Sequence, residues 1–212
     1  MEELFKQMEV TLEDGDVKKL KELTQTAIDR KIDPQVILNQ GLISSMLKLG
    51  TKFKLGQVYI PEVLMSARAM NEAITLLKPS FGAAGLAYKG KFLIGTVKDD
   101  LHDIGKNLVG MMLEGAGYRV VDLGINVPAE VFVQKVREEE PEIVGISALL
   151  TTTIGQMETI IVGLKAAGLR EKVKVMVGGA PVTDRFAKEI GADAYAEDAG
   201  SAVELANKML VI

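Results

Sequence analysis

Two hydrophobic patterns divide the chain near residue 85. Through roughly the first 80 residues, apolar side chains recur at the three- and four-residue spacing of amphipathic helices. From Lys91 onward, short runs rich in β-branched residues alternate with amphipathic segments. Between the two patterns, residues 79–90 contain proline, glycine and small side chains that interrupt both and predict a linker. We therefore expect two domains, residues 1–85 and residues 86–212.

The first domain is predicted to be an N-terminal all-α helical bundle. Asp16 is placed to cap one helix, and the pair Asp33-Pro34 is typical of the start of a second. A further helix opens at Pro61, after a segment over residues 50–60 that holds two glycines and several apolar residues expected to be exposed. Short connections between these helices favour antiparallel neighbours.

The second domain is predicted to consist of five repeats of a strand followed by a helix. Such alternation favours parallel strands joined by right-handed crossovers. The simplest arrangement is a C-terminal α/β domain with a flavodoxin-like (Rossmann-like) five-stranded parallel sheet of order 2-1-3-4-5. The predicted strands are Lys91–Val97, Arg119–Gly124, Glu142–Leu149, Lys172–Gly179 and Asp193–Glu197. The predicted helices lie near residues 105–115, 129–140, 153–167, 183–190 and 201–210.

Composition removes several classes of function. The chain has 25 Lys plus Arg against 29 Asp plus Glu and no long basic run, so nucleic acid is a poor candidate partner. The absence of cysteine excludes disulfides, thiolate metal sites and a cysteine nucleophile. The acidic N-terminus does not resemble a signal peptide, and no run of about 18 apolar residues occurs. We expect a cytoplasmic protein with no membrane partner.

The most unusual loops follow the first and third predicted strands, where the strand order reverses and a ligand crevice opens. The first loop holds the single histidine of the chain, His102, between Asp100 and Asp103. One imidazole cannot build an ordinary zinc or iron site, but a metal bound mostly by a macrocycle needs only one protein ligand. Asp100 is placed to accept the Nδ1–H and leave Nε2 as the donor atom. A hydroxyl of Ser147 or Thr153, in the second loop, could extend this network.

A purely structural interpretation of the same residues is also open. Asp100 or Asp103 could satisfy backbone N–H groups in a helix-capping loop, with His102 incidental. The pair Gly178-Gly179 could serve only a tight turn. A short Asp/His/Gly pattern does not by itself separate these interpretations from a functional one.

The joint spacing of three motifs resembles the fingerprint of cobalamin-binding domains. Asp100-x-His102-x-x-Gly105 is followed after 41 residues (106–146) by Ser147-x-Leu149, and then after 28 residues (150–177) by Gly178-Gly179. The first half, through residues 50–63 and 66–70, resembles the helical cap domain of the same proteins. This pairing is found in cobalamin-dependent methionine synthase and in the corrinoid proteins of methanol, methylamine, betaine and methoxyaromatic methyltransferase systems.

The resemblance implies that the chain binds cobalamin or a related corrinoid in the base-off/His-on mode and carries its methylcobalamin form. His102 would be the metal ligand, with Asp100 and Thr153 in the relay behind it. Thr153 departs from the family, where serine is common, but it retains the hydroxyl. The corrinoid-binding residues that the resemblance assigns to this domain are Asp99, Asp100, His102, Asp103, Ile104, Gly105, Ser147, Leu149, Thr151, Thr153, Gly178 and Gly179.

The same resemblance assigns an apolar lid above the cobalt to the helical domain. Its residues are Phe53, Tyr59, Ile60 and Val63. Such a lid would keep Co(I) from water and oxidants. Bundle core is the alternative interpretation for all four residues, and the favoured one for Val63. The lid must move for substrates to reach the metal, and residues 82–90 are the predicted hinge.

The function implied is that of a methyl carrier rather than a self-sufficient enzyme. A donor-specific methyltransferase would load Co(I), and an acceptor methyltransferase would pass the methyl group to tetrahydrofolate or a thiol, with a reductive activase as a third partner. Three alternatives remain at this point: a cobalamin-dependent sensor or regulator, an adenosylcobalamin mutase subunit, and an FMN-binding or receiver-like module with the same sheet.

Overall fold

The protein divides into two compact units in the computed structural model, which describes residues 1–84 and 86–210. The first unit comprises Met1–Tyr88 together with Gly115–Gly117, and the second comprises Lys89–Glu114 and the described chain from Tyr118 onward. The boundary predicted between residues 85 and 86 involves residue 85, which lies outside the described residues.

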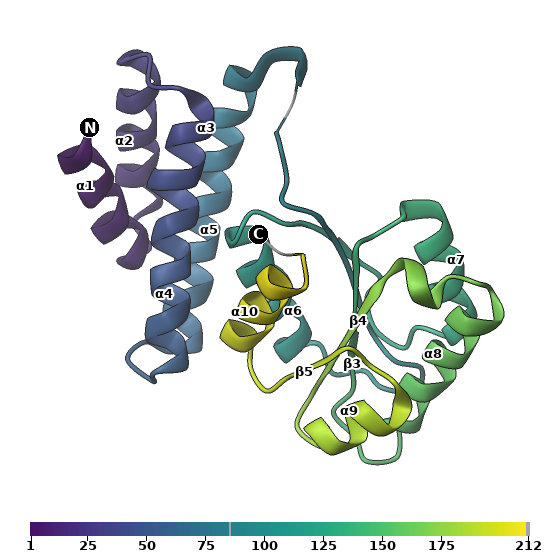
Figure 1. Ribbon diagram of the computed structural model, residues 1–212. Coiled ribbons are helices and arrows are strands. Elements are labelled where there is room, and N and C mark those ends of the chain that lie inside the picture. The colour runs from purple at the N-terminus through teal and green to yellow at the C-terminus, as the bar shows by residue number, and fades with distance from the viewer. Residues whose placement is uncertain (85, 211–212) are drawn as a thin grey trace. The chain divides into compact units, whose positions relative to one another are not determined.

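The first unit is a bundle of helices (Figure 1). Asp16 caps α2 by accepting the Lys19 N–H at 3.0 Å, and Asp33 caps α3 through the Gln35 and Val36 N–H groups, as predicted. Helix α4 reaches Lys54, so part of the segment 50–60 is helical. The elements are α1 (Glu2–Glu13), α2 (Val17–Asp29), α3 (Pro34–Val36), a π-helix η1 (Ile37–Ile43), α4 (Ser44–Lys54), α5 (Ile60–Leu77) and a 3₁₀ helix η2 (Lys78–Ala84).

The longer helices of this unit bury apolar residues on one side. In α1 they form a stripe of Leu4, Met8 and Leu12, spaced four residues apart and almost without exposed surface. Helix α2 packs against α5, and α1 packs against α2 and α4. The spacing of apolar residues therefore accounts for the bundle.

The second unit contains a five-stranded parallel sheet of order β2-β1-β3-β4-β5, which confirms the predicted topology. The strands are shorter than predicted because their end residues leave the ladder to enter loops, and Arg170–Lys172 forms a 3₁₀ turn (η3) before β4. The strands are β1 (Lys91–Thr96), β2 (Arg119–Asp122), β3 (Ile143–Ser147), β4 (Lys174–Gly178) and β5 (Ala194–Ala196).

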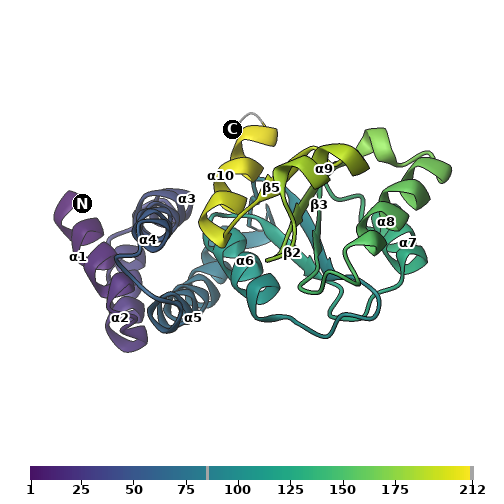
Figure 2. The same ribbon diagram turned by 90° about the horizontal axis from the view of Figure 1, so that it is seen from below.

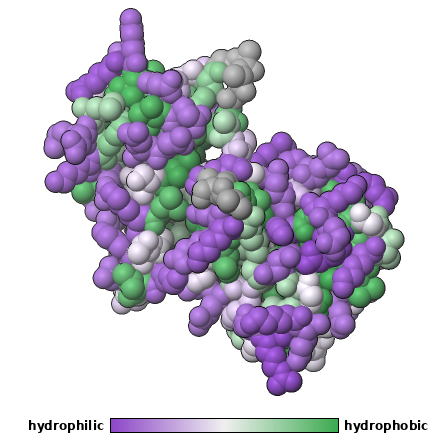
Figure 3. All heavy atoms as spheres, viewed as in Figure 1, coloured by the Kyte–Doolittle hydropathy of each residue, from purple (hydrophilic) through white to green (hydrophobic). Residues whose placement is uncertain are grey.

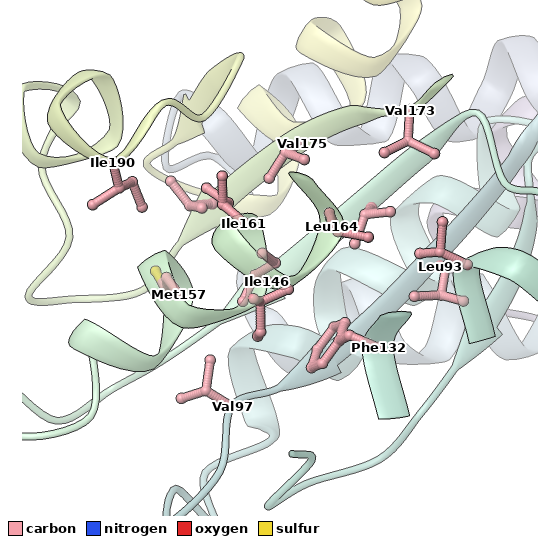
Figure 4. Close-up of a cluster of buried hydrophobic side chains, with 14 of the residues drawn as sticks. Leu93, Val97, Phe132, Ile146, Met157, Ile161, Leu164, Val173, Val175 and Ile190 are labelled. Atoms are coloured by element: carbon pink, nitrogen blue, oxygen red, sulfur yellow. The ribbon is translucent and has the colours of Figure 1, made fainter. Parts of the chain in front are cut away.

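Helices cover both faces of the sheet, with α7, α8 and α9 on one face and α6 and α10 on the other (Figure 2). Phe132 of α7 and Ile161 of α8 meet Leu93 of β1 and Ile146 of β3 in a buried cluster on the first face (Figure 4). The helices are α6 (Ile104–Gly115), α7 (Ala129–Glu139), α8 (Gly155–Ala166), α9 (Asp184–Ile190) and α10 (Ala199–Met209). Burial on both faces explains the near-continuous apolar runs of the central strands.

The surface shown in Figure 3 is largely polar. On the face shown in Figure 3, hydrophilic side chains predominate and hydrophobic ones appear in separate patches. Among the described residues, no helix combines the length and the apolar character needed to cross a bilayer.

The turn after β4 requires glycine for reasons within the protein itself. Gly179 has a φ of 132°, and a Cβ built there would lie 1.8 Å from the carbonyl oxygen of Ala148. A Cβ on Gly178 would lie 3.0 Å from the carbonyl oxygen of Ala196. The two glycines therefore allow the chain to turn where β4 ends between its neighbouring strands. The close approach of these glycines to a ligand stays a prediction.

Gly179→Ala should lower the free energy of unfolding by about 3 kcal/mol, because the backbone conformation is one that essentially only glycine adopts and the added methyl overlaps a carbonyl. Urea unfolding of the apoprotein followed by circular dichroism measures the loss. Gly105→Ala is the matched control, since no atom lies within 4 Å of its Cβ position and its stability should change little. Equal losses at the two positions would contradict this account.

Candidate functional site

The two loops singled out from the sequence lie side by side at the carboxyl edge of the sheet. Strands β1 and β3 are neighbours, with Thr96 paired to Ser147 at their ends. The Val97 N–H donates to the Ser147 carbonyl at 3.0 Å and continues the pairing into the loops. The adjacent strands therefore hold the His102 loop beside the loop over residues 148–154.

The carboxylate of Asp100 is the centre of the hydrogen-bond network. Its side chain has no exposed surface. Oδ1 accepts the His102 backbone N–H at 3.1 Å and lies 2.7 Å from His102 Nδ1. Oδ2 accepts the N–H groups of Leu149 at 2.7 Å and Leu150 at 3.3 Å, and the Thr153 hydroxyl at 2.9 Å. Of the two hydroxyls considered from the sequence, that of Thr153 reaches Asp100.

These donors keep Asp100 ionised. Burial would raise its pKa, but the Leu149 N–H, the His102 ring and backbone, and the Thr153 hydroxyl together hold the pKa well below its usual range. An ionised carboxylate can only accept hydrogen bonds, so the proton between the two side chains belongs to His102 Nδ1. In the neutral ring, Nε2 therefore carries the free lone pair.

The imidazole of His102 is anchored on one side and open on the other. Half of its side chain is exposed, although the paired Asp100 is fully buried. The His102 backbone carbonyl accepts the Thr96 hydroxyl at 2.9 Å, so hydrogen bonds hold the backbone as well as the ring. An imidazole fixed through Nδ1 with its other nitrogen available is the arrangement of a metal-ligating histidine.

Gly105 differs from the glycines after β4. It lies exposed in the first turn of α6, and no atom of the described chain lies within 4 Å of its Cβ position. Nothing in this part of the fold requires glycine there. The open space fits the predicted close approach of a ligand.

The other predicted residues border the same edge of the unit. Ile104 and Leu149 expose 73% and 44% of their surface, which is unusual for large apolar side chains and leaves an apolar rim on both loops. Thr151 is also exposed. Asp103 accepts hydrogen bonds from the backbone and the side chain of Asn107.

The helix-capping alternative explains only part of this geometry. Asp100 does satisfy three backbone N–H groups, as that interpretation required. The same carboxylate also bonds the ring of His102, so the histidine is not incidental to the loop.

The four predicted lid residues lie in the helical unit. Phe53 is half-buried near the end of α4, and Tyr59 and Ile60, at the start of α5, are 69% and 40% exposed. Val63 is completely buried, in agreement with the core interpretation favoured for it. The role of these residues above a cobalt stays a prediction.

Sequence reasoning missed a third loop, which follows β2. Asn126 accepts the Asp99 N–H through Oδ1 at 2.8 Å, and Asp122 forms an ion pair with the buried Lys106. The signal was present in the sequence, since β2 neighbours β1 in the predicted order and the loop after β2 therefore ends at the same edge of the sheet. The site residues predicted for this unit lie at or after the ends of the first, third and fourth strands, and none lies in this loop.

Family models match both halves of the chain. Residues 90–204 match a model described as B12 binding domain, and residues 4–78 match a second model with the same description. A corrinoid protein of Desulfitobacterium hafniense is 43% identical over 210 residues, which cover 98% of this chain and 97% of that protein. The chain belongs to the B12-binding corrinoid proteins.

Other relatives of this corrinoid protein include the trimethylamine corrinoid protein of Methanosarcina barkeri, 42% identical over 95% of this chain and 94% of that protein. A chain of the crystal structure of a methanol:cobalamin methyltransferase complex from the same organism aligns with a TM-score of 0.89 and 32% identity, covering 99% of this chain and 80% of that chain. A cobalamin-binding protein from Desulfitobacterium hafniense aligns with a TM-score of 0.81 and 32% identity, covering 97% and 98%.

The donor groups of the corrinoid protein fit such a cofactor. Within the described residues, no group of three or more His, Asp or Glu side chains could hold a metal ion without further ligands. A macrocycle that occupies the other coordination positions needs only one nitrogen, and His102 Nε2 is available for that role. The apolar rim and the space at Gly105 suit a large ring placed over the loop.

The ionised state of Asp100 predicts a dependence of stability on pH. Because the pKa in the folded protein is depressed, the stabilisation by the carboxylate is present above about pH 4, the unfolded value, and is lost as the pH falls through the folded value. Asp100→Asn should cost about 2 kcal/mol at pH 7, and the deficit relative to the native sequence should shrink at pH 3.

Urea unfolding at the two pH values tests this expectation. Leu164→Ala removes core volume without any change in an ionisable group, so its deficit should be the same at both pH values. An Asp100→Asn deficit that is equally independent of pH would show that the carboxylate is not ionised within the network.

Proposed function

We propose that this corrinoid protein is the methyl carrier of a multi-component methyltransferase system. The observation that carries the proposal is the half-exposed His102 imidazole, whose Nδ1 bonds a buried, ionised Asp100 and whose Nε2 is free. When bound, the corrinoid supplies a cobalt centre that in its reduced form accepts a methyl group and later releases it. The similarity to a dimethylamine corrinoid protein, a trimethylamine corrinoid protein and a chain of a methanol:cobalamin methyltransferase complex supports this class of reaction.

The residues of the His102 loop would hold the cofactor in the base-off/His-on mode. His102 Nε2 would bind the metal, and Asp100 would fix the tautomer and raise the basicity of the ring. The rim formed by Ile104 and Leu149, with the space at Gly105, would accept the macrocycle and its displaced tail. We propose that the other residues assigned to the cofactor from the sequence also contact the corrinoid. Among them are Ser147, Gly178 and Gly179.

The side chains of Asp100 and His102 would also control the protonation of the imidazole. An imidazole that is not bound to a metal through Nε2 would take up a proton at that atom, and the Asp100 carboxylate would stabilise the imidazolium. The Thr153 hydroxyl lies 2.9 Å from Asp100 Oδ2 and 3.0 Å from the Leu150 carbonyl, so its single proton can be donated to either oxygen. Threonine therefore keeps the contact with Asp100 that the relay needs.

The donor and the acceptor of the methyl group are assigned to partner proteins. We propose a donor-specific methyltransferase, an acceptor methyltransferase and a reductive activase as the partners. Phe53, Tyr59 and Ile60 are proposed as the lid over the metal, and the segment 82–90, of which residue 85 lies outside the described chain, as its hinge.

His102→Gly tests the axial ligand. The apoprotein is loaded with hydroxocobalamin, reduced to Co(II), and examined by electron paramagnetic resonance for splitting from an axial nitrogen. The native protein should show that splitting, and the variant should lack it because the ligand atom is gone. Free imidazole added to the variant should restore it, which controls for damage to the site. A variant spectrum identical to the native one would refute axial ligation.

Gly105→Leu tests the space at the start of α6. The side chain would fill the volume assigned to the corrinoid, so affinity for hydroxocobalamin should fall at least about tenfold, the equivalent of 1.4 kcal/mol. Gly155→Leu is the matched control, because Gly155 also lies exposed in a first helical turn with no atom within 4 Å of its Cβ position. Spectroscopic titration measures both. Equal affinities for the two variants would remove Gly105 from the site.

A further inference from the structure

Asn126, in the loop after β2, contacts the His102 loop through both its side chain and its backbone. Asn126 Oδ1 accepts the Asp99 N–H at 2.8 Å, and the Asn126 N–H donates to the Asp100 carbonyl at 3.0 Å. Asp99 and Asn126 both have left-handed backbone conformations, with φ values of 64° and 53°. Asparagine tolerates this conformation better than most residues, so the position suits both its backbone and its side chain.

The loop after β2 is itself firmly held. Asp122, the last residue of β2, accepts the Gly124 N–H through Oδ1 at 2.8 Å and pairs with Lys106 through Oδ2. The Lys106 side chain is almost completely buried, and its ammonium also donates to Asn107 Oδ1 at 2.6 Å. A further contact, between Val97 and Val127, ties the two loops together as an isolated parallel bridge.

The buried lysine is unfavourable in its place. It lies in the first turn of α6, where the helix dipole disfavours a positive charge, and its burial costs desolvation energy. An apolar side chain of similar length would fill the volume without these costs. What the ion pair adds is a defined position for the end of β2 relative to α6, the helix that follows the His102 loop.

We propose that Asn126 is a positioning residue for His102. Asp100 is held at its carboxylate from the β3 side. From the β2 side, the Asn126 N–H holds the Asp100 carbonyl and the Asn126 side chain holds the N–H of the preceding residue, Asp99. Both supports are needed to orient the carboxylate toward Nδ1. Without the Asn126 side chain, the peptide between residues 98 and 99 loses its N–H partner and can rotate, and the Asp100–His102 bond weakens. The consequence for the cobalt rests on the proposed function, but the effect on the imidazole does not.

Two substitutions separate the side chain from the backbone. Asn126→Gly keeps the left-handed conformation and the backbone N–H but removes the acceptor for Asp99. Asn126→Asp keeps an acceptor oxygen at the same place. A role in positioning His102 requires that the first variant shows the defect and that the second does not.

The tautomer of the apoprotein imidazole is the first measurement. Because His102 is the only histidine, its two ring nitrogens give the only imidazole signals in a ¹⁵N spectrum. In the native protein the Nδ1–H form should predominate, and in Asn126→Gly the ratio should shift about fivefold toward the Nε2–H form, the effect of one hydrogen bond. Asn126→Asp should retain the native ratio.

The loaded protein gives the second measurement. With Co(II) corrinoid bound, Asn126→Gly should increase the ratio of unligated to ligated imidazole about fivefold by electron paramagnetic resonance, and Asn126→Asp should match the native protein. A native tautomer ratio in Asn126→Gly would overturn the proposal, including the case in which that variant only loses stability to urea. If native protein lacks a nitrogen ligand, the proposed function fails while the tautomer still decides the role of Asn126.

Discussion

The hydrogen bond between the buried carboxylate of Asp100 and the ring of His102 organises this edge of the protein. A charge with no exposed surface is costly unless hydrogen-bond donors surround it. The N–H groups of Leu149 and Leu150 and the hydroxyl of Thr153 supply that compensation. The path of the loop after β3 is therefore determined by the requirements of a residue that follows β1.

This constraint gives the imidazole two different sides. The Nδ1 side is hydrogen-bonded to the buried Asp100 carboxylate, whereas the Nε2 side is open to a ligand. A corrinoid already binds its cobalt through the macrocycle, so one oriented nitrogen is what the fold has to add. In the proposed function, this chain therefore orients the His102 nitrogen and controls its proton. Partner proteins supply the methyl donor and the methyl acceptor.

The glycines show how similar residues serve unlike purposes. Gly178 and Gly179 are needed where β4 passes the carbonyl groups of Ala196 and Ala148, so the backbone alone accounts for them. Gly105 faces open space, and a ligand is the better explanation. The sequence motif contains all three, and only the surroundings of each Cβ position distinguish them.

The sequence by itself determined the class of each half, the strand order and the pairing of Asp100 with His102. These depend on periodicity, on the rules of parallel sheets and on a separation of two residues, all of which are local or topological. Tertiary structure decided that Thr153 rather than Ser147 reaches the carboxylate, and it revealed the support from Asn126 and Lys106. These contacts join residues that are 16 to 53 positions apart in the sequence. Their existence depends on where each loop runs after it leaves the sheet, which no spacing along the chain encodes.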